Sequence, residues 1–113
     1  MSEHFLCRLG ELANPGSKGF EVMPDGETKP VSGFVVRKGV HVYAYRNSCP
    51  HTGAPLEWMP DQFLDLADSF IQCSLHGALF VIEDGRCLRG PCVGDHLQPL
   101  SVELRQGEVW LRL

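Results

Sequence analysis

The chain has 113 residues, of which 43% are apolar and 21% are charged, and these proportions exclude a disordered chain and indicate a single soluble domain, residues 1–113. The formal net charge is −4 and Lys and Arg form no cluster, so the sequence offers no basic surface for nucleic acid. No stretch stays apolar for the length that a membrane span requires.

Glycine and proline divide the chain into short segments, a pattern typical of all-β proteins. The sequence contains 12 Gly and 8 Pro. The segments between them are rich in Val, Phe, Tyr and Leu, and they alternate or run apolar over only a few residues, which predicts β-strands. We expect strands at residues 5–9, 20–23, 33–37, 41–45, 69–72, 79–82, 87–88, 100–104 and 108–111.

Turn signals separate several of these strands. Arg-Lys-Gly at 37–39, Glu-Asp-Gly at 83–85 and Arg-Gln-Gly at 105–107 each predict a tight turn between antiparallel neighbours. The only helical candidate is residues 62–68, "QFLDLAD", for which a structured loop is the alternative.

The chain contains five cysteines, a high number for its length. The N-terminal sequence "MSEHFLCRLGEL" has neither the basic start nor the apolar run of a secretory signal, so we expect a cytoplasmic location, where thiols stay reduced. Under those conditions the cysteines favour metal binding over a disulfide framework. We expect Cys7 and Cys87 to pack as small buried side chains.

Two expected loops each contain a cysteine followed closely by a histidine. The first reads "CPHTG" and contains Cys49 and His51; the second reads "CSLHG" and contains Cys73 and His76. Two Cys and two His are an acceptable set for structural zinc, although zinc sites usually group like ligands together. A 2Fe-2S cluster with two Cys on one iron and two His on the other needs one ligand of each kind from each loop. The spacing therefore favours such a cluster over zinc.

"CPHTGAPL" together with "CSLHGALF" resembles the paired cluster-binding motifs of Rieske iron–sulfur proteins. "RGPCVGDHLQPL" is similar to the proline loop that covers the cluster in that family. The resemblance implies an all-β Rieske fold, in which antiparallel sheets carry a small cluster-binding subdomain formed by two loops, at about residues 46–95. It also implies one 2Fe-2S cluster, bound by Cys49 and Cys73 on the inner iron and by His51 and His76 on the outer iron. Cys92 and His96 fall in the proline loop; a plain loop role is favoured for both, with proximity to the cluster as the alternative for Cys92.

The resemblance also suggests a low reduction potential. High-potential members carry a further cysteine in each motif, which together form a disulfide, and they use Ser and Tyr hydroxyls as donors to the cluster sulfurs. Ala54 and Leu75 stand at the disulfide positions, and Ala78 and Phe80 stand at the donor positions. Fewer donors disfavour the more negative reduced state, so we expect a potential near the low end of the Rieske range of roughly −150 to +300 mV.

Low-potential members are electron carriers, and the resemblance implies a ferredoxin that passes one electron from a reductase to an acceptor such as a ring-hydroxylating oxygenase. Outside the motifs only His4, His41 and His96 remain, all expected at the surface or in turns, so no catalytic iron site is expected. No flavin or nicotinamide fingerprint is present. We therefore expect redox partner proteins, no catalysis by this chain, and a monomer or weak oligomer. The alternatives are a small subunit or redox-sensing accessory protein of a larger oxidoreductase, or a zinc-binding module.

The spacer between the two motifs is longer than is usual in the family, and it carries apolar and acidic side chains. Trp58, Met59 and Phe63 either cover the cluster or form a patch for a partner, and packing is the favoured interpretation. We interpret the acidic run as a surface that steers a basic redox partner, with an ordinary solvated face as the alternative. The acidic residues are Glu57, Asp61, Asp65 and Asp68.

Overall fold

The computed structural model describes residues 2–50, 52–75 and 77–113, and these form an almost entirely β structure. Every predicted strand is present, with ends shifted by a few residues, so the all-β prediction is confirmed. The strands are β1 (Glu3–Arg8), β2 (Gly16–Val22), β3 (Val31–Lys38), β4 (His41–Arg46), β5 (Ile71–Gln72), β6 (Leu79–Phe80), β7 (Cys87–Arg89), β8 (Pro99–Arg105) and β9 (Glu108–Arg112).

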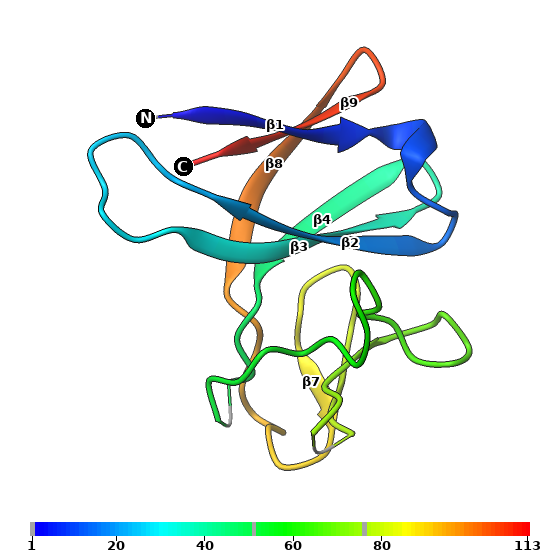
Figure 1. Cartoon of the computed structure of the whole chain (residues 1–113). Helices are drawn as coiled ribbons and strands as arrows, with labels where there is room; N and C mark the ends of the chain where they lie inside the picture. The colour runs from blue at the N-terminus through cyan, green and yellow to red at the C-terminus, as the bar shows by residue number, and fades with distance from the viewer. Residues whose placement is uncertain (1, 51, 76) are drawn as a thin grey trace.

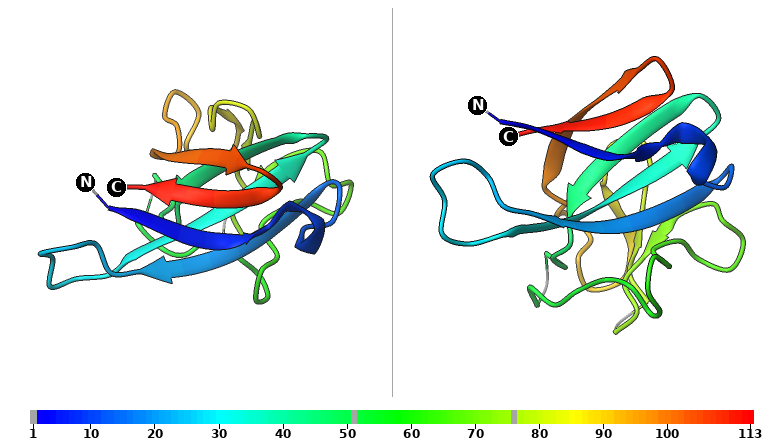
Figure 2. Two further views of the ribbon diagram at one scale, coloured as in Figure 1. Left: turned by 90° about the horizontal axis from the view of Figure 1, so that it is seen from above. Right: turned by 45° about the horizontal axis from the view of Figure 1, so that its top comes forward.

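The strands form two antiparallel sheets of different size. The larger sheet has the order β1-β9-β8-β4-β3-β2, and the smaller has the order β5-β6-β7. The smaller sheet and its loops lie below the larger sheet in Figure 1, and the tilted view in Figure 2 shows the same arrangement. The three predicted turns connect β3 to β4, β6 to β7 and β8 to β9, each pair being antiparallel.

Strand β3 is buried on both faces and divides the core in two. Residues 33–36 are all buried, and successive side chains of a strand point to opposite faces. Phe34 and Val36 therefore pack into the core cluster that contains the motif loops. Val35 points the other way and packs with Cys7 and other apolar residues of the larger sheet.

Of the two alternatives that the sequence left open for residues 62–68, the structured loop is confirmed and the helix is wrong. The main-chain groups of Phe63 bond outside the segment, which leaves them unable to make helical bonds. The Phe63 amide donates to Ser17 Oγ at 3.2 Å, and the Phe63 carbonyl accepts from the Gln72 amide at 2.9 Å. Among the described residues the helical element is a short 3-10 turn, Leu9–Glu11. No helix in this part of the chain is long and apolar enough to cross a membrane.

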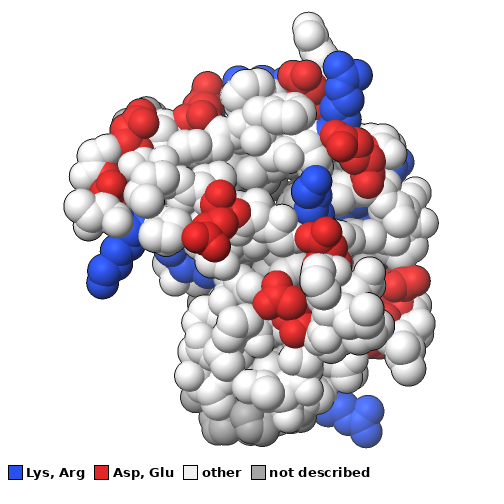
Figure 3. Space-filling model, in the orientation of Figure 1, with Lys and Arg blue, Asp and Glu red and all other residues white. Residues whose placement is uncertain are grey.

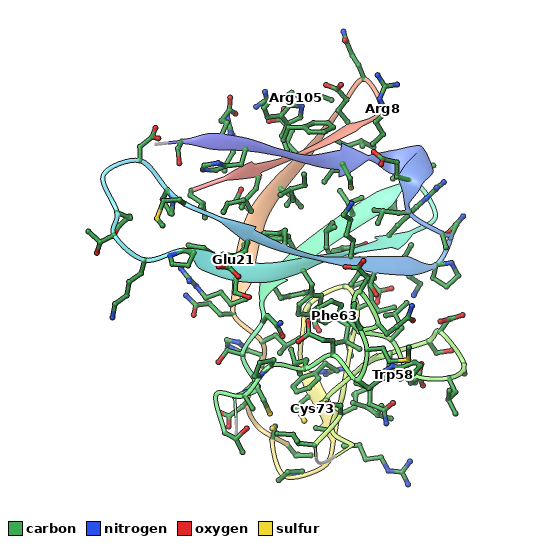
Figure 4. All side chains as sticks on the ribbon, viewed as in Figure 1. Arg8, Glu21, Trp58, Phe63, Cys73 and Arg105 are labelled. Atoms are coloured by element: carbon green, nitrogen blue, oxygen red, sulfur yellow. The ribbon has the colours of Figure 1, made fainter. Side chains whose placement is uncertain are left out.

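Two contacts fasten the loop region to the larger sheet. The Phe63 ring stacks on Phe34 of β3, with centroids 4.3 Å apart and planes 9° apart, and Figure 4 shows Phe63 between the larger sheet and the region that contains Cys73. Tyr45 of β4 donates its hydroxyl to the Ile82 carbonyl at 2.6 Å. Both contacts are buried, so they join the two parts of the molecule through one core.

Replacing Phe63 with Ala should reduce the free energy of unfolding by about 3–5 kcal/mol, because the fully buried ring leaves a cavity against Phe34. A urea titration measures this. The control is Leu66→Ala in the same spacer, where the side chain is 96% exposed and a change within about 0.5 kcal/mol is expected. Similar small effects for both variants would contradict the anchoring role of Phe63.

Replacing Tyr45 with Phe should cost about 1–3 kcal/mol at neutral pH, because the buried Ile82 carbonyl loses its donor. Burial raises the pKa of the Tyr45 phenol above its ordinary value of about 10. Since the folded-state pKa lies above the unfolded one, the wild type keeps this stability below about pH 10 and loses it progressively as the pH rises toward the folded-state pKa.

The Tyr45→Phe variant should therefore lose less stability than the wild type on going from about pH 8 to about pH 10.5. Urea titrations at the two pH values measure the difference, with Tyr43→Phe on the same strand as the control. An equal alkaline loss in the wild type and Tyr45→Phe would contradict the account.

Candidate metal centre

The first motif loop turns back on itself immediately after Cys49. The Cys49 amide donates to the Ala54 carbonyl at 2.8 Å, and the Gly53 amide donates to the Cys49 carbonyl at 2.7 Å. This pair of bonds fixes the backbone on both sides of Cys49. The cysteine side chain is directed inward and is only 1% exposed.

The second motif loop repeats the same two bonds. The Cys73 amide donates to the Ala78 carbonyl and the Gly77 amide donates to the Cys73 carbonyl, both at 2.9 Å. Cys73 is 0% exposed. The two loops thus present one buried thiol each from equivalent turns, although their Cys-to-His spacings in the sequence differ.

Each of these turns contains a glycine whose backbone conformation L side chains rarely adopt. Gly53 has φ +76° and Gly77 has φ +67°. Apart from the chain neighbours, a Cβ at either position would meet no atom of the described residues closer than 3.9 Å. Glycine is therefore required for the left-handed dihedral angle of the turn and not for space.

The two motif loops are joined directly by main-chain and side-chain bonds. The Ser74 amide, next to Cys73, donates to the Leu56 carbonyl of the first loop at 3.0 Å. Asn47 braces the first loop, since its Oδ1 accepts from the Leu56 amide at 2.8 Å and its Nδ2 donates to the Glu57 carboxylate at 3.0 Å. Sequence analysis missed Asn47. Its position at the start of a loop, where Asn side chains commonly bond to nearby backbone, was the available signal.

The buried thiols fit a soft metal centre. Cys49 and Cys73 belong to the same core cluster, and thiolate sulfur is the ligand that iron–sulfur clusters use. His51 and His76 lie outside the described residues, so their part in the ligand set stays a prediction. Without them, the described residues include no group of three or more His, Cys, Asp or Glu side chains able to hold a metal ion.

The segment that resembles the proline loop, residues 89–100, is here called the covering loop, and it places Cys92 beside the first motif. Cys92 is 0% exposed, and its Sγ lies 3.7 Å from Cys49 Sγ. The favoured prediction of a plain loop role is wrong for Cys92, because the loop folds over the motif instead of standing out in solvent. His96 of the same loop is exposed, with Nδ1 3.1 Å from the Leu97 carbonyl oxygen.

The positions that distinguish high-potential from low-potential members carry apolar side chains. Ala78 and Phe80 are both 0% exposed and have no side-chain group that can donate a hydrogen bond. Ala54 is half-buried, while Leu75 is 60% exposed. The expected low potential keeps its physical basis here and remains a prediction.

Acidic residues of the spacer accept hydrogen bonds from the main chain, a structural role that the sequence analysis did not predict. Asp61 Oδ1 accepts from the Gly19 amide at 2.8 Å. Asp65 Oδ1 accepts from the amides of Ser69 and Phe70 at 2.8 and 3.1 Å. Steering of a basic partner stays a prediction, but these carboxylates, like Glu57, already act as acceptors within the chain.

The spacer also exposes apolar surface. Phe63 is buried as predicted, whereas Trp58 and Met59 are 49% and 53% exposed, so the packing interpretation is wrong for these two. On the face shown in Figure 3, uncharged atoms cover most of the lower part of the molecule, and the acidic side chains are spread over the middle and upper parts.

The remaining cysteines and histidines lie where the sequence predicted. Cys7 and Cys87 are buried, at 1% and 4% exposure, and burial raises the pKa of the Cys7 thiol. His41 is exposed at the start of β4, and His4 on β1 lies 2.9 Å from Ser2 Oγ. Cys87 packs in the same core cluster as Cys49 and Cys73, and Cys7 packs in the separate cluster of the larger sheet.

Comparison with known families identifies the fold. The Rieske 2Fe-2S domain family matches residues 3–104, so this chain belongs to that family. The predicted family, the fold and a cofactor of one 2Fe-2S cluster are confirmed, and the zinc alternative loses its support.

Individual relatives share the full extent of the chain. The 3-phenylpropionate/cinnamic acid dioxygenase ferredoxin subunit of Photorhabdus laumondii is 25% identical over 111 residues, covering 98% of this chain and 94% of that protein. The ferredoxin of carbazole 1,9a-dioxygenase from Nocardioides aromaticivorans is 28% identical with a TM-score of 0.75, covering 98% and 97% of the two chains. A chain from a complex of reduced oxygenase and oxidized ferredoxin in carbazole 1,9a-dioxygenase is 26% identical with a TM-score of 0.73, covering 96% and 91%.

Replacing Gly53 or Gly77 with Ala should destabilise the protein by about 1–2 kcal/mol, because a Cβ disfavours the left-handed turn. We also expect the metal centre to be lost at a lower temperature, which visible absorbance during heating measures. Gly10→Ala is the control, since Gly10 has no positive φ and a Cβ there would meet nothing within 4 Å. Equal stability of Gly53→Ala and Gly10→Ala would show that the turn does not require glycine.

Proposed function

We propose that this chain is a Rieske-type ferredoxin that carries single electrons from a reductase to an oxygenase of the ring-hydroxylating kind. The observation that carries the proposal is that this chain matches two ferredoxins of dioxygenase systems over nearly their full length. The equivalent turns that bury Cys49 and Cys73 support it, because they supply the thiolate half of a Rieske ligand set.

Cys49, His51, Cys73 and His76 would hold the cluster. When bound, the cluster supplies a one-electron acceptor and donor. The protein keeps the two thiols out of water, since both lie in the core, and such exclusion limits side reactions of the bound group. The ligand assignment and a single-domain organisation over residues 1–113, with the cluster region at about 46–95, are part of the proposal.

A partner would dock at the motif end of the molecule. Leu75, which precedes His76, is 60% exposed, and Val93 of the covering loop is 64% exposed. Apolar residues exposed next to a redox site favour close approach of a partner, which electron transfer between proteins requires. Trp58 and Met59 of the long spacer offer further exposed apolar surface to a partner. Selectivity for one partner over another would therefore arise in the spacer. The cytoplasmic location, the weak or absent oligomerisation and the lack of catalysis by this chain are further parts of the proposal.

The purified protein should be red-brown, and its reduced form should give the EPR signal of a cluster with mixed Cys and His ligands. His51→Cys should assemble a cluster with an altered signal, because one nitrogen ligand becomes sulfur. Cys87→Ser, which changes a buried cysteine outside the motifs, should keep the wild-type signal. A colourless protein with stoichiometric zinc would refute the proposal, and so would a His51→Cys signal identical to that of the wild type.

Electron delivery is tested with a ferredoxin reductase and a ring-hydroxylating oxygenase. The cluster should be reduced by the first and reoxidised by the second on the time scale of turnover, followed by visible absorbance. The rate should fall as the ionic strength rises if the acidic spacer steers the partner. A cluster that is reduced but is not reoxidised by any such oxygenase would indicate a sensing role instead.

A further inference from the structure

A second buried thiol lies against the sulfur of a motif cysteine. Cys92 Sγ is 3.7 Å from Cys49 Sγ in hydrogen-bonding geometry, and either thiol can be the donor when both are protonated. Both side chains are at most 1% exposed and share one core cluster. Sequence motifs assign no role to Cys92.

Metal binding would decide which of the two sulfur atoms donates the hydrogen bond and which accepts it. A cysteine ligand binds as its thiolate, which has no proton to donate. With Cys49 as a ligand, Cys92 is therefore the only one of the two that can donate. An S–H donor is weak in itself, but an ionised acceptor strengthens the bond.

The covering loop holds Cys92 at this position from both sides. Gly90, at φ +100°, passes so close to Ala78 of the second motif loop that a Cβ there would lie 2.9 Å from Ala78 Cα. The Asp95 amide donates to the Cys92 carbonyl at 2.8 Å. Asp95 in turn accepts from the Cys87 amide of β7 at 3.0 Å. The loop thus contacts the second motif with its backbone and the first with the Cys92 side chain.

We propose that the Cys92 thiol donates a hydrogen bond to the Cys49 sulfur and raises the reduction potential of the metal centre. The inference rests on the proposed function, because it takes Cys49 as a ligand. Reduction adds negative charge to the ligand sulfur, so the donor stabilises the reduced state more than the oxidised one. Cys92 would partly replace the hydroxyl donors that Ala78 and Phe80 lack.

Reduction potentials of four variants test the proposal, with potentials taken from redox titration of the cluster-loaded protein. Cys92→Ala removes the donor, and Cys92→Val removes it with an apolar side chain slightly larger than that of Cys, so that no cavity is left. Both should lower the equilibrium constant for reduction by roughly threefold to tenfold, which is about 30 to 60 mV at 59 mV per tenfold. Cys92→Ser keeps an O–H donor and should stay closer to the wild type than Cys92→Val.

Cys87→Ala is the matched control, since Cys87 is a buried thiol of the same core cluster whose Sγ lies 3.3 Å from the Arg89 carbonyl oxygen. Its potential should equal that of the wild type. The proposal is overturned if Cys92→Val keeps the wild-type potential, if Cys87→Ala shifts as far as Cys92→Val, or if Cys92→Ser shifts as far as Cys92→Val.

Infrared spectroscopy of the wild type gives a second measurement that does not depend on the apolar variants assembling. The S–H stretching band of Cys92 should move to lower frequency on reduction, because its acceptor becomes more negative. The moving band should be absent in Cys92→Ser and present in Cys87→Ala. A reduction difference spectrum with no moving S–H band overturns the proposal. Failure of the wild type to give a Rieske EPR signal would instead refute the proposed function.

Discussion

The structure depends on withdrawing two cysteine side chains from water into one core. Cys49 and Cys73 are almost fully buried, and the same pair of main-chain hydrogen bonds sets each of them at the start of a turn. Burying thiolates is costly unless a metal binds them. A bound metal would therefore offset the cost of burying the two thiolates. The turns that contain Gly53 and Gly77 hold the two cysteines in this buried position.

The cluster-binding region is too small to be stable alone. Its strands β5, β6 and β7 have 2, 2 and 3 residues, and so small a sheet needs packing against other elements. Phe34 and Tyr45 supply that packing from the larger sheet, Phe34 by stacking on Phe63, and β3 supports it because both faces of the strand are buried. Binding of the cluster adds to this stability, since metal binding is coupled to folding.

Local pattern was sufficient for the strands and the motif loops. Alternation of apolar residues and the turn signals act between near neighbours, so the hairpins at 37–39 and 105–107 could be predicted from the sequence. For the segment 62–68 and for Cys92 the sequence offered two alternatives each and could not decide between them. Both depend on contacts between positions far apart in the chain, through Ser17 for the first and Cys49 for the second, and a single sequence does not reveal such contacts. The role of Asn47 was not predicted, because its side-chain amide bonds to Leu56 and Glu57 and the residue belongs to neither motif.

The expected low reduction potential, the proposed role of Cys92 and the proposed docking surface all depend on one claim. The claim is that one pair of ligands binds each of two iron atoms, two Cys on one iron and two His on the other. Iron K-edge X-ray absorption together with Mössbauer spectroscopy of the purified protein tests that claim most directly. The account predicts two inequivalent irons, one with sulfur ligands only and the other with two nitrogen ligands from His51 and His76. Two equivalent irons with sulfur ligands alone, or a single zinc ion in their place, would contradict it.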